Sequence, residues 1–473
     1  MPRPIRLVGA ALALAACALA APASAQQVDF HGYFRASALL SIEERKAEDV
    51  PAEADAETRD FRLPRLIDNR YFESGFAYLP VNETDWAELD VIAGNEHVWG
   101  TVVLTASSFS DATTVGNLLP GGQKGFHQGY VTLDYALVET AEQRARLALR
   151  AGVFSERFGY LPRYDTYVLG RTHLAGGQLH GLFSQGPVDL ALKLGVGQHT
   201  PDAGSPDDRL TPTTYAHFAP SLAFGKNRVG LGVFTLNSFA QDQILGVGTD
   251  ADMTIRGVEL GLDLSSVGSL YAALSQIDVE RPSGLAGAVE VVHSFKPSSL
   301  DAYWGAGAVD GELTNLALQL DVSARRLLAA TAIAPRLGNF DLTASLFNLY
   351  VKAASDAPAV APGTPYDVWV GRDGRSFHKW GAELNLRALS WLGAALRYDR
   401  VNLDTEYVGS DFNVLAPRVI FYPQLGWSSN ALIYLQYSHY TYGQNVKQPQ
   451  QTASRFGPEL DTNVFKIQGQ LTF

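Results

Sequence analysis

The sequence predicts a transmembrane antiparallel β-barrel of about 18 strands, with 16 strands as the alternative count. Three observations predict this fold: segments in which apolar and polar residues alternate, an export signal ahead of them, and a last segment that ends in phenylalanine. Alternation with a period of two gives a strand one apolar face and one polar face. A barrel in a membrane turns the apolar faces to lipid and the polar faces to its lumen.

The N-terminal residues form the export signal. Two arginines precede an apolar stretch from Leu7 to Ala21, and Ala23-Ser24-Ala25 provides a cleavage site of small residues. This order of charged, apolar and small residues is typical of a secretory signal peptide. We therefore assign residues 1–25 to the signal peptide and residues 26–473 to a single outer-membrane β-barrel domain.

The composition excludes several other classes of protein. No interior segment approaches the ~18–20 consecutive apolar residues that a membrane helix needs. Removal of the signal peptide changes the net charge from −12 to −14, and an acidic chain without a basic run predicts no nucleic-acid partner. The only cysteine, Cys17, lies in the signal, so the mature chain has no disulfide. Leu14-Ala15-Ala16-Cys17 also fits the lipoprotein pattern, which leaves a lipid-anchored surface interaction protein as an alternative.

The alternation is clearest in the first and last segments. In the first, Phe30 and Phe34 share one parity and polar residues occupy the other. In the last, the apolar residues, ending with Phe473, alternate with polar ones. We expect Phe473 to face lipid, and Lys466 and Gln468 to face the lumen, because a basic residue in the middle of the apolar band costs ~2–4 kcal/mol.

The connections between these segments are of two kinds. The short ones are Gly186-Pro187, Gly225-Lys226-Asn227, Ser266-Val267-Gly268, residues 337–339 and Leu389-Ser390. The long ones are residues 42–68, 110–125, 157–174, 201–212, 356–374 and 443–461. Long loops at one rim and tight turns at the other indicate a transmembrane barrel. A soluble β-sandwich could alternate as well, but the export signal, the final phenylalanine and the aromatic residues near strand ends favour the barrel. Residues 279–334 do not divide into strands by this pattern.

Motifs for catalysis are missing from the sequence. The ten histidines are scattered, and there is no Gly-x-Ser-x-Gly turn, phosphate-binding glycine loop or metal-ligand spacing. We therefore expect no enzyme activity, no cofactor and no metal. A barrel of 16–18 strands leaves an aqueous channel, so the sequence predicts a passive channel in the outer membrane of a Gram-negative bacterium.

The mature chain opens with Val28-Asp29-Phe30-His31-Gly32-Tyr33-Phe34-Arg35. This stretch resembles the start of the maltoporin family, which consists of trimeric eighteen-stranded sugar channels. In that family the tyrosine belongs to an aromatic slide and the arginine to a polar track that binds sugar hydroxyls. The resemblance implies these roles for Tyr33 and Arg35.

Two later segments also resemble this family. Tyr71-x-Glu73 is similar to a pair with one slide and one track residue, and Arg65 is a looser match to a track arginine. The resemblance implies that Tyr33 and Tyr71 face the lumen from adjacent strands of the first hairpin.

The third matching segment starts at Arg157 and includes Asp165-x-Tyr167. It is similar to the family's third loop, in which the equivalent residues bind sugar. We expect residues 157–174 to fold into the lumen and narrow it. The sequence departs from the family pattern by lacking the cysteine pair of the first loop, and by carrying Thr472 where the family has a tryptophan.

These features predict passive diffusion of small hydrophilic solutes, with carbohydrates as the expected class. The expected partners are outer-membrane lipid, lipopolysaccharide and sugars, and the expected assembly is a homotrimer. A general or anion-preferring porin is the alternative, because arginines are frequent on the lumen parity. The charged residues concerned, which could also pair with one another as wall charges, are Arg35, Arg146, Arg150, Arg387, Arg397, Glu73, Glu383 and Asp399. Tyr434 and Tyr440 share this parity and are candidates for a later aromatic contribution.

Overall fold

The computed structural model describes residues 27–41, 86–107, 124–140, 142–157, 171–199, 212–240, 251–280, 310–329, 338, 340–356, 375–402, 405, 411–423, 430–443 and 462–473. These residues form 18 β-strands and one short helix. The strands are β1 (Gln27–Ser41), β2 (Trp86–Gly94), β3 (Val98–Ser107), β4 (Lys124–Glu139), β5 (Gln143–Arg157), β6 (Arg171–Gln185), β7 (Val188–His199), β8 (Pro212–Phe224), β9 (Asn227–Ala240), β10 (Ala251–Leu264), β11 (Gly268–Glu280), β12 (Asp310–Ser323), β13 (Asp341–Ser355), β14 (Arg375–Arg387), β15 (Leu392–Asn402), β16 (Asp411–Phe421), β17 (Asn430–Tyr442) and β18 (Thr462–Thr472).

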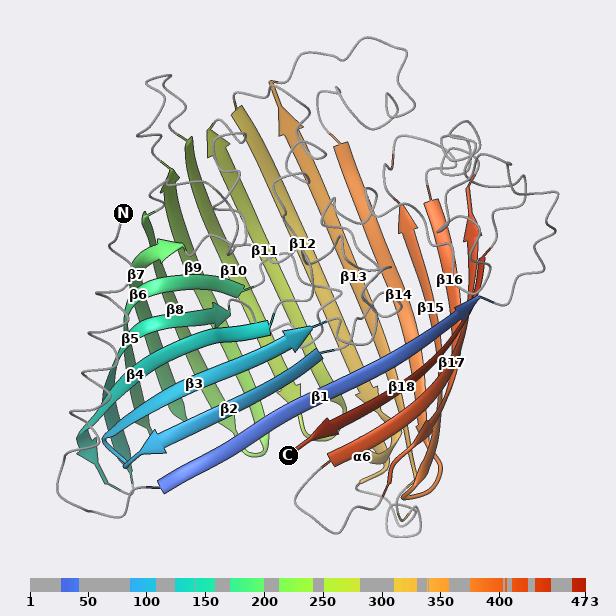
Figure 1. Ribbon diagram of the computed structural model, residues 1–473, viewed down its shortest axis with the longest axis horizontal. Coiled ribbons are helices and arrows are strands. Elements are labelled where there is room, and N and C mark those ends of the chain that lie inside the picture. Colours follow the sequence, from blue (N-terminus) through green and yellow to red (C-terminus); the bar gives the residue numbers. More distant parts are fainter. Residues whose placement is uncertain are drawn as a thin grey trace.

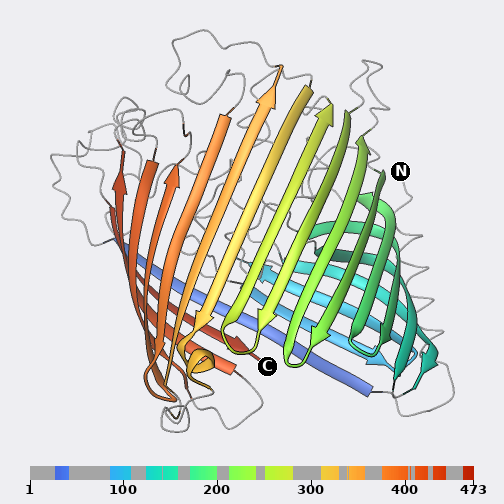
Figure 2. The same ribbon diagram turned by 180° about the vertical axis from the view of Figure 1, so that it is seen from behind.

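The strands form one closed sheet. Each strand pairs antiparallel with its neighbours in the sequence, and β1 also pairs with β18. Figures 1 and 2 show the resulting barrel from opposite sides. The predicted count of 18 strands is confirmed, and a sandwich of two sheets is excluded.

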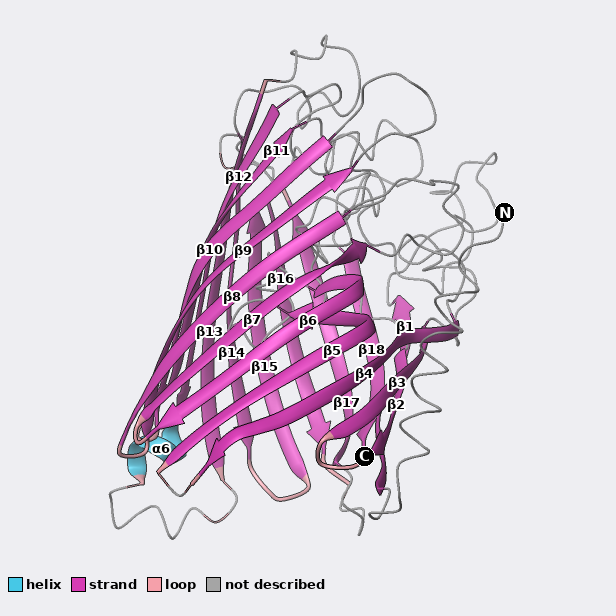
Figure 3. Ribbon diagram, turned by 90° about the vertical axis from the view of Figure 1, so that its left-hand side faces the viewer, coloured by secondary structure: helices cyan, strands magenta, loops and turns pink. Residues whose placement is uncertain are grey.

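Short turns gather at one rim of the barrel, where β1 begins and β18 ends (Figures 1 and 3). Two of the predicted turns lie there, and each contains a glycine with positive φ: Gly186 at 55° and Gly225 at 64°. The other rim carries the long connections. By the rule for outer-membrane barrels, the turn rim is periplasmic and the loop rim is extracellular.

The connection between β12 and β13 is longer than the predicted turn at residues 337–339. Ser323 ends β12 and its Oγ accepts a hydrogen bond from the Arg326 backbone N–H at 3.2 Å, which caps α6 (Ala324–Leu328). The same hydroxyl donates to Asp341, the first residue of β13, at 3.0 Å. This serine cap starts a helical turn directly after β12, and within the predicted turn at residues 337–339 the structure describes Gly338, which has a positive φ of 54°. In the part of the chain that the structure describes, no helix is long and apolar enough to cross a membrane.

The two faces of the wall differ as the alternation predicts. Lys466 and Gln468 are 1% and 0% exposed on the inner face, whereas Ile467 and Phe473 are 40% and 48% exposed on the outer face. In β14, Glu383 is likewise buried on the inner face, and the next residue, Leu384, is 49% exposed on the outer face. The predicted orientations of Phe473, Lys466 and Gln468 are therefore confirmed.

An aromatic girdle lies on the outer face of β13–β17, in the half of these strands nearer the loop rim. Its members are Tyr350, Trp380, Tyr398 and Tyr437. The Trp380 and Tyr398 ring centroids are 5.5 Å apart. The Tyr437 hydroxyl donates to Asn463 at 2.6 Å and the Tyr398 hydroxyl donates to Asn413 at 2.9 Å. Rings with one polar end are typical of the membrane interface, so the girdle marks the outer edge of the apolar band.

The barrel closes where the last residue meets β1. The Gly32 N–H donates to the Phe473 carbonyl at 2.8 Å, and the Phe473 N–H donates to the Gly32 carbonyl at 3.0 Å. The Phe473 ring occupies the space beside Gly32, where an added Cβ would lie 2.3 Å from a ring carbon. A larger residue at position 32 would therefore require this ring to move.

The variant Gly32→Val is therefore expected to weaken barrel closure by about 1–3 kcal/mol, the usual cost of overpacking. The measurement is the temperature at which the folded band on a denaturing gel converts to the unfolded band. Gly469→Val is the matched control, because a Cβ added at Gly469 meets no atom within 4 Å. An equal loss of stability in both variants would contradict this role of Gly32.

Candidate functional site

The first of the predicted site residues lie on the inner face of β1. Tyr33 and Arg35 are both partly exposed there, and the Arg35 guanidinium carbon is 5.9 Å from the centre of the Tyr33 ring. Across the strand pairs, Tyr33 lies opposite Glu88 of β2 and Arg35 lies opposite Gln470 of β18. The structure thus places one ring and one cation side by side on the inner wall.

The strand beside β1 is not the one that the resemblance implied. β1 is paired on one edge with β2 and on the other with β18, so the adjacent strand starts at Trp86 and does not carry Tyr71. The predicted lumenal position of Tyr71 stays a prediction, because this residue lies outside the described residues. Five of the predicted residues lie outside the described residues: Arg65, Tyr71, Glu73, Asp165 and Tyr167. Arg157 ends β5, and only its backbone pairing with Arg171 is described.

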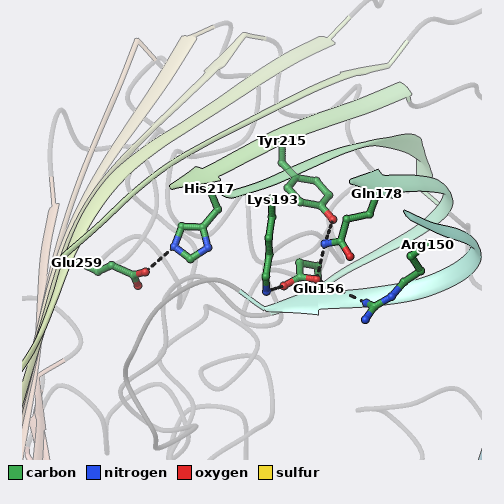
Figure 4. A network of polar contacts seen from close by, with 7 residues as sticks. All are labelled: Arg150, Glu156, Gln178, Lys193, Tyr215, His217 and Glu259. Carbon is green, nitrogen blue, oxygen red and sulfur yellow. Dashed lines mark hydrogen bonds and ion pairs between the residues drawn. The ribbon is translucent and has the colours of Figure 1, made fainter. Parts of the chain in front are cut away.

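A polar network covers the inner face of β5–β8 (Figure 4). Its centre is the Glu156 carboxylate of β5, which is only 7% exposed. The Lys193 ammonium of β7 donates to it, and Gln178 of β6 donates to it at 2.7 Å. The Arg150 guanidinium lies 3.8 Å from the same carboxylate, and Gln178 also donates to the Tyr215 hydroxyl of β8 at 2.7 Å. We call these five residues the Glu156 network.

Burial explains why this carboxylate collects partners. A buried charge is tolerated only where cations and hydrogen-bond donors replace the water that it has lost. Lys193 and Arg150 keep 27% and 29% of their side-chain surface exposed, so they present positive charge to the lumen as well as to Glu156. His217 and Glu259 form a second pair next to the network, with 2.7 Å between ring nitrogen and carboxylate oxygen (Figure 4).

Glycines on neighbouring strands make room for the large inward side chains. A Cβ at Gly195 would lie 2.1 Å from the Tyr215 ring, and a Cβ at Gly257 would lie 2.1 Å from the Phe234 ring. Each ring therefore lies along the wall of the barrel, over a position without a side chain.

A second group of charges occupies the inner face of β14–β18. We call it the Arg397 cluster, and its members are Lys379, Glu383, Arg397, Asp399, Arg418 and Lys466. Arg397 binds both oxygens of Asp399, at 2.8 and 3.0 Å, and lies 3.8 Å from Glu383. Arg418 lies 3.6 Å from Glu383. The prediction that Arg397 pairs with these two carboxylates is confirmed.

Aromatic rings accompany the cations of this cluster. Arg397 lies 4.5 Å from the centre of the Phe347 ring. Arg418 and Lys466 lie 5.4 and 5.6 Å from the centre of the Tyr434 ring. Tyr434 and Tyr440 are 7% and 1% exposed on the inner face, as their parity predicts. Cation–π attraction of this kind helps to hold the cations in place on the inner wall.

The two groups lie on opposite sides of the barrel. In the closed ring of 18 strands, β7 in the Glu156 network and β16 in the Arg397 cluster are nine strands apart in either direction. The cluster holds more cations than carboxylates among its described residues, whereas the network and the adjacent pair balance the two signs. Of these two groups, the one on β14–β18 is therefore the more positive. Among the described residues, no group of three or more histidines, cysteines or carboxylates is placed to hold a metal ion.

Sequence reasoning missed most of these partners. Arg150 pairs with Glu156, and Arg146 pairs with Asp134 at 3.0 Å; the suggested partner Glu73 lies outside the described residues. Arg387 donates to the Ser390 carbonyl at 3.2 Å. The alternation already placed these charges on the inner face, but the partners depend on the register between strands, which single segments do not reveal.

The inner face is polar and charged, the outer face is apolar, and the sheet is closed. The chain is an outer-membrane β-barrel. Only a closed barrel lets strands cross lipid without unpaired backbone groups, and 18 strands around a polar inner face form a passive channel.

Comparisons with known proteins add a general likeness of fold. No protein-family model matches the chain, and no curated protein matches it. OmpT, an outer-membrane protein of Vibrio cholerae, is 8% identical with a TM-score of 0.40, over 96% of this chain and 99% of that one. OccAB1 of Acinetobacter baumannii is 11% identical with a TM-score of 0.44, over 94% and 96%. OccD3 of Pseudomonas aeruginosa is 10% identical with a TM-score of 0.41, over 95% and 91%. Similarity this distant carries no argument about the solute, and the maltoporin resemblance stays a prediction.

The role of the Glu156 carboxylate in ion selectivity can be tested by substitution. Glu156→Gln removes the carboxylate that Lys193 and Arg150 share, so the wall gains positive charge. We expect about a fivefold rise in the chloride-to-potassium permeability ratio, since one charge about 8 Å from an ion in water shifts the energies of chloride and potassium by about 0.5 kcal/mol each, in opposite directions. The measurement is the reversal potential of the full-length channel in a salt gradient. Glu142→Gln, in an exposed turn, is the matched control, and equal permeability ratios in both variants would contradict the role of Glu156.

Proposed function

We propose that the protein is a passive diffusion channel for small hydrophilic solutes and that it prefers anionic ones. The observation that carries this proposal is the excess of cations over carboxylates in the Arg397 cluster. The cluster lies on the inner face of β14–β18, so its positive side faces the interior of the barrel. No bond is made or broken in this process, and no cofactor takes part.

Burial increases the range of these charges. Arg397, Lys379 and Lys466 are at most 3% exposed, and buried charges are screened by salt much less than charges at a free surface. Arg418, with 15% of its side chain exposed, is the member that a solute can reach directly. The field of the cluster attracts an anion, and Arg418 then donates hydrogen bonds to it.

The test of this proposal is Arg418→Gln. Removal of one partly exposed cation is expected to lower the chloride-to-potassium permeability ratio about fivefold, by the same Coulomb argument. The reversal potential in a salt gradient gives this ratio. Arg325→Gln is the matched control, because Arg325 is exposed in α6 at the turn rim. A channel that prefers potassium before any substitution would contradict the proposal.

Carbohydrates are the second candidate class of solute. The observation in favour is the pair of Tyr33 and Arg35 on the inner face of β1, where a ring lies beside a hydrogen-bond donor. A sugar offers an apolar ring face and a rim of hydroxyls, so this pair suits both surfaces. Conduction requires that such binding be shallow and repeated along the path.

This second candidate is tested by Tyr33→Ala. Loss of a contact of ~1 kcal/mol is expected to weaken the block of ion current by maltooligosaccharides about fivefold. Tyr437→Ala removes a tyrosine from the outer face and is the matched control. If no oligosaccharide blocks the wild-type channel, the carbohydrate proposal is wrong, while the anion proposal is judged separately by the permeability ratio.

A further inference from the structure

A groove lies on the outer face of the barrel, over β7–β12. It has a volume of about 650 Å³. Phe218, Val233, Val258 and Leu274 line its apolar part, and each of these side chains is 41–50% exposed. The groove is therefore part of the surface that meets lipid, and it is separate from the inner face with its charge clusters.

One end of the groove is polar. Along β10 the outward residue after Val258 in the direction of the loop rim is Arg256, and along β11 the residue after Leu274 is Gln276. Arg256 and Gln276 lie directly opposite each other in the strand pair, and Gln276 lies opposite Thr314 of β12. All three residues line the groove. The groove thus has an apolar half toward the periplasmic rim and a polar half toward the extracellular rim.

Arg256 is exposed, and within the part of the chain that the structure describes it forms no hydrogen bond or ion pair. The outward acids nearest to it are Asp252 and Asp278, which lie further toward the loop rim. Asp278 already accepts a hydrogen bond from Gln276 at 3.0 Å. An arginine on the lipid face of a barrel is unfavourable unless it lies near the interface or meets an anion, and a planar guanidinium binds phosphate through two parallel hydrogen bonds.

We propose that the groove binds one molecule of lipid A, the phosphorylated and acylated glycolipid of the outer leaflet. A phosphate group of lipid A binds Arg256, and an acyl chain lies along Val233, Val258 and Leu274. Lipid A fits this groove in charge, because its phosphates are anionic and Arg256 is a cation. It also fits in orientation, because Arg256 lies at the extracellular end of the apolar groove. A phospholipid of the inner leaflet would present its headgroup at the opposite end.

Native mass spectrometry of the full-length barrel in detergent tests the proposal. The probes are hexa-acylated lipid A with two phosphates and, for comparison, phosphatidylethanolamine. The wild-type barrel is expected to retain one lipid A in preference to phosphatidylethanolamine, and Arg256→Gln is expected to weaken this binding on the order of fivefold. Arg400→Gln is the matched control, because Arg400 is an exposed outward cation of β15, five strands from Arg256 and away from the groove. Equal lipid A binding by the two variants overturns the proposal, as does equal retention of both lipids by the wild type.

A second variant tests the apolar half of the groove independently. Val258→Trp fills the groove and leaves Arg256 in place, so it is expected to lower lipid A occupancy as well. Conversion of the folded gel band on heating shows whether each variant retains the barrel. A folded Val258→Trp barrel that binds lipid A like the wild type overturns the proposed path of the acyl chain.

Discussion

The rest of the structure depends on one constraint, which is that backbone groups inside a membrane must find all their hydrogen-bond partners within the protein. A sheet meets this constraint only when its first and last strands pair. Here β1 pairs with β18, and the backbone bonds between Gly32 and Phe473 extend that pairing to the last residue. Closure also decides that each strand has an inner and an outer face, so every side chain is assigned to lipid or to the interior.

The inner face then has to accommodate its charges. Because the described inward charges are largely buried, they occur with partners, as Glu156 does with Lys193 and Arg397 does with Asp399. Buried pairs of this kind contribute little net stability compared with apolar packing. They instead fix where positive and negative potential lies around the wall. The Arg397 cluster makes one side of the interior positive, and this unequal distribution connects the fold with solute preference.

The outer face also differs from one side of the barrel to the other. On β13–β17 the apolar band ends in the aromatic girdle, where tyrosine hydroxyls bind neighbouring polar side chains. On β10–β12 the apolar residues give way instead to Arg256, Gln276 and Thr314. An interface of aromatic rings suits any lipid, whereas a groove with a cation at its end distinguishes lipids by their headgroups. The two sides therefore offer the membrane different surfaces.

The sequence by itself determined the alternating strands, their faces and the rims, but not β12, which lies in the segment that did not divide into strands. Alternation is a local property of each segment, so the lumenal position of Lys466 and the lipid-facing position of Phe473 were predictable without any knowledge of the neighbours. Turn residues such as Gly186 were predictable for the same reason. The helical turn capped by Ser323 was missed, because a serine near the end of an alternating segment fits a strand as well as a cap.

Only the tertiary structure decided which side chains meet. Glu156 and Lys193 are 37 positions apart in the sequence and come together across β6. The alternation in β1 likewise did not reveal that its partner is β2, which begins at Trp86. Register and strand order follow from the closure of all 18 strands together, and no single segment contains that information. The polar end of the groove likewise forms only because Arg256, Gln276 and Thr314 lie at matching positions on three neighbouring strands.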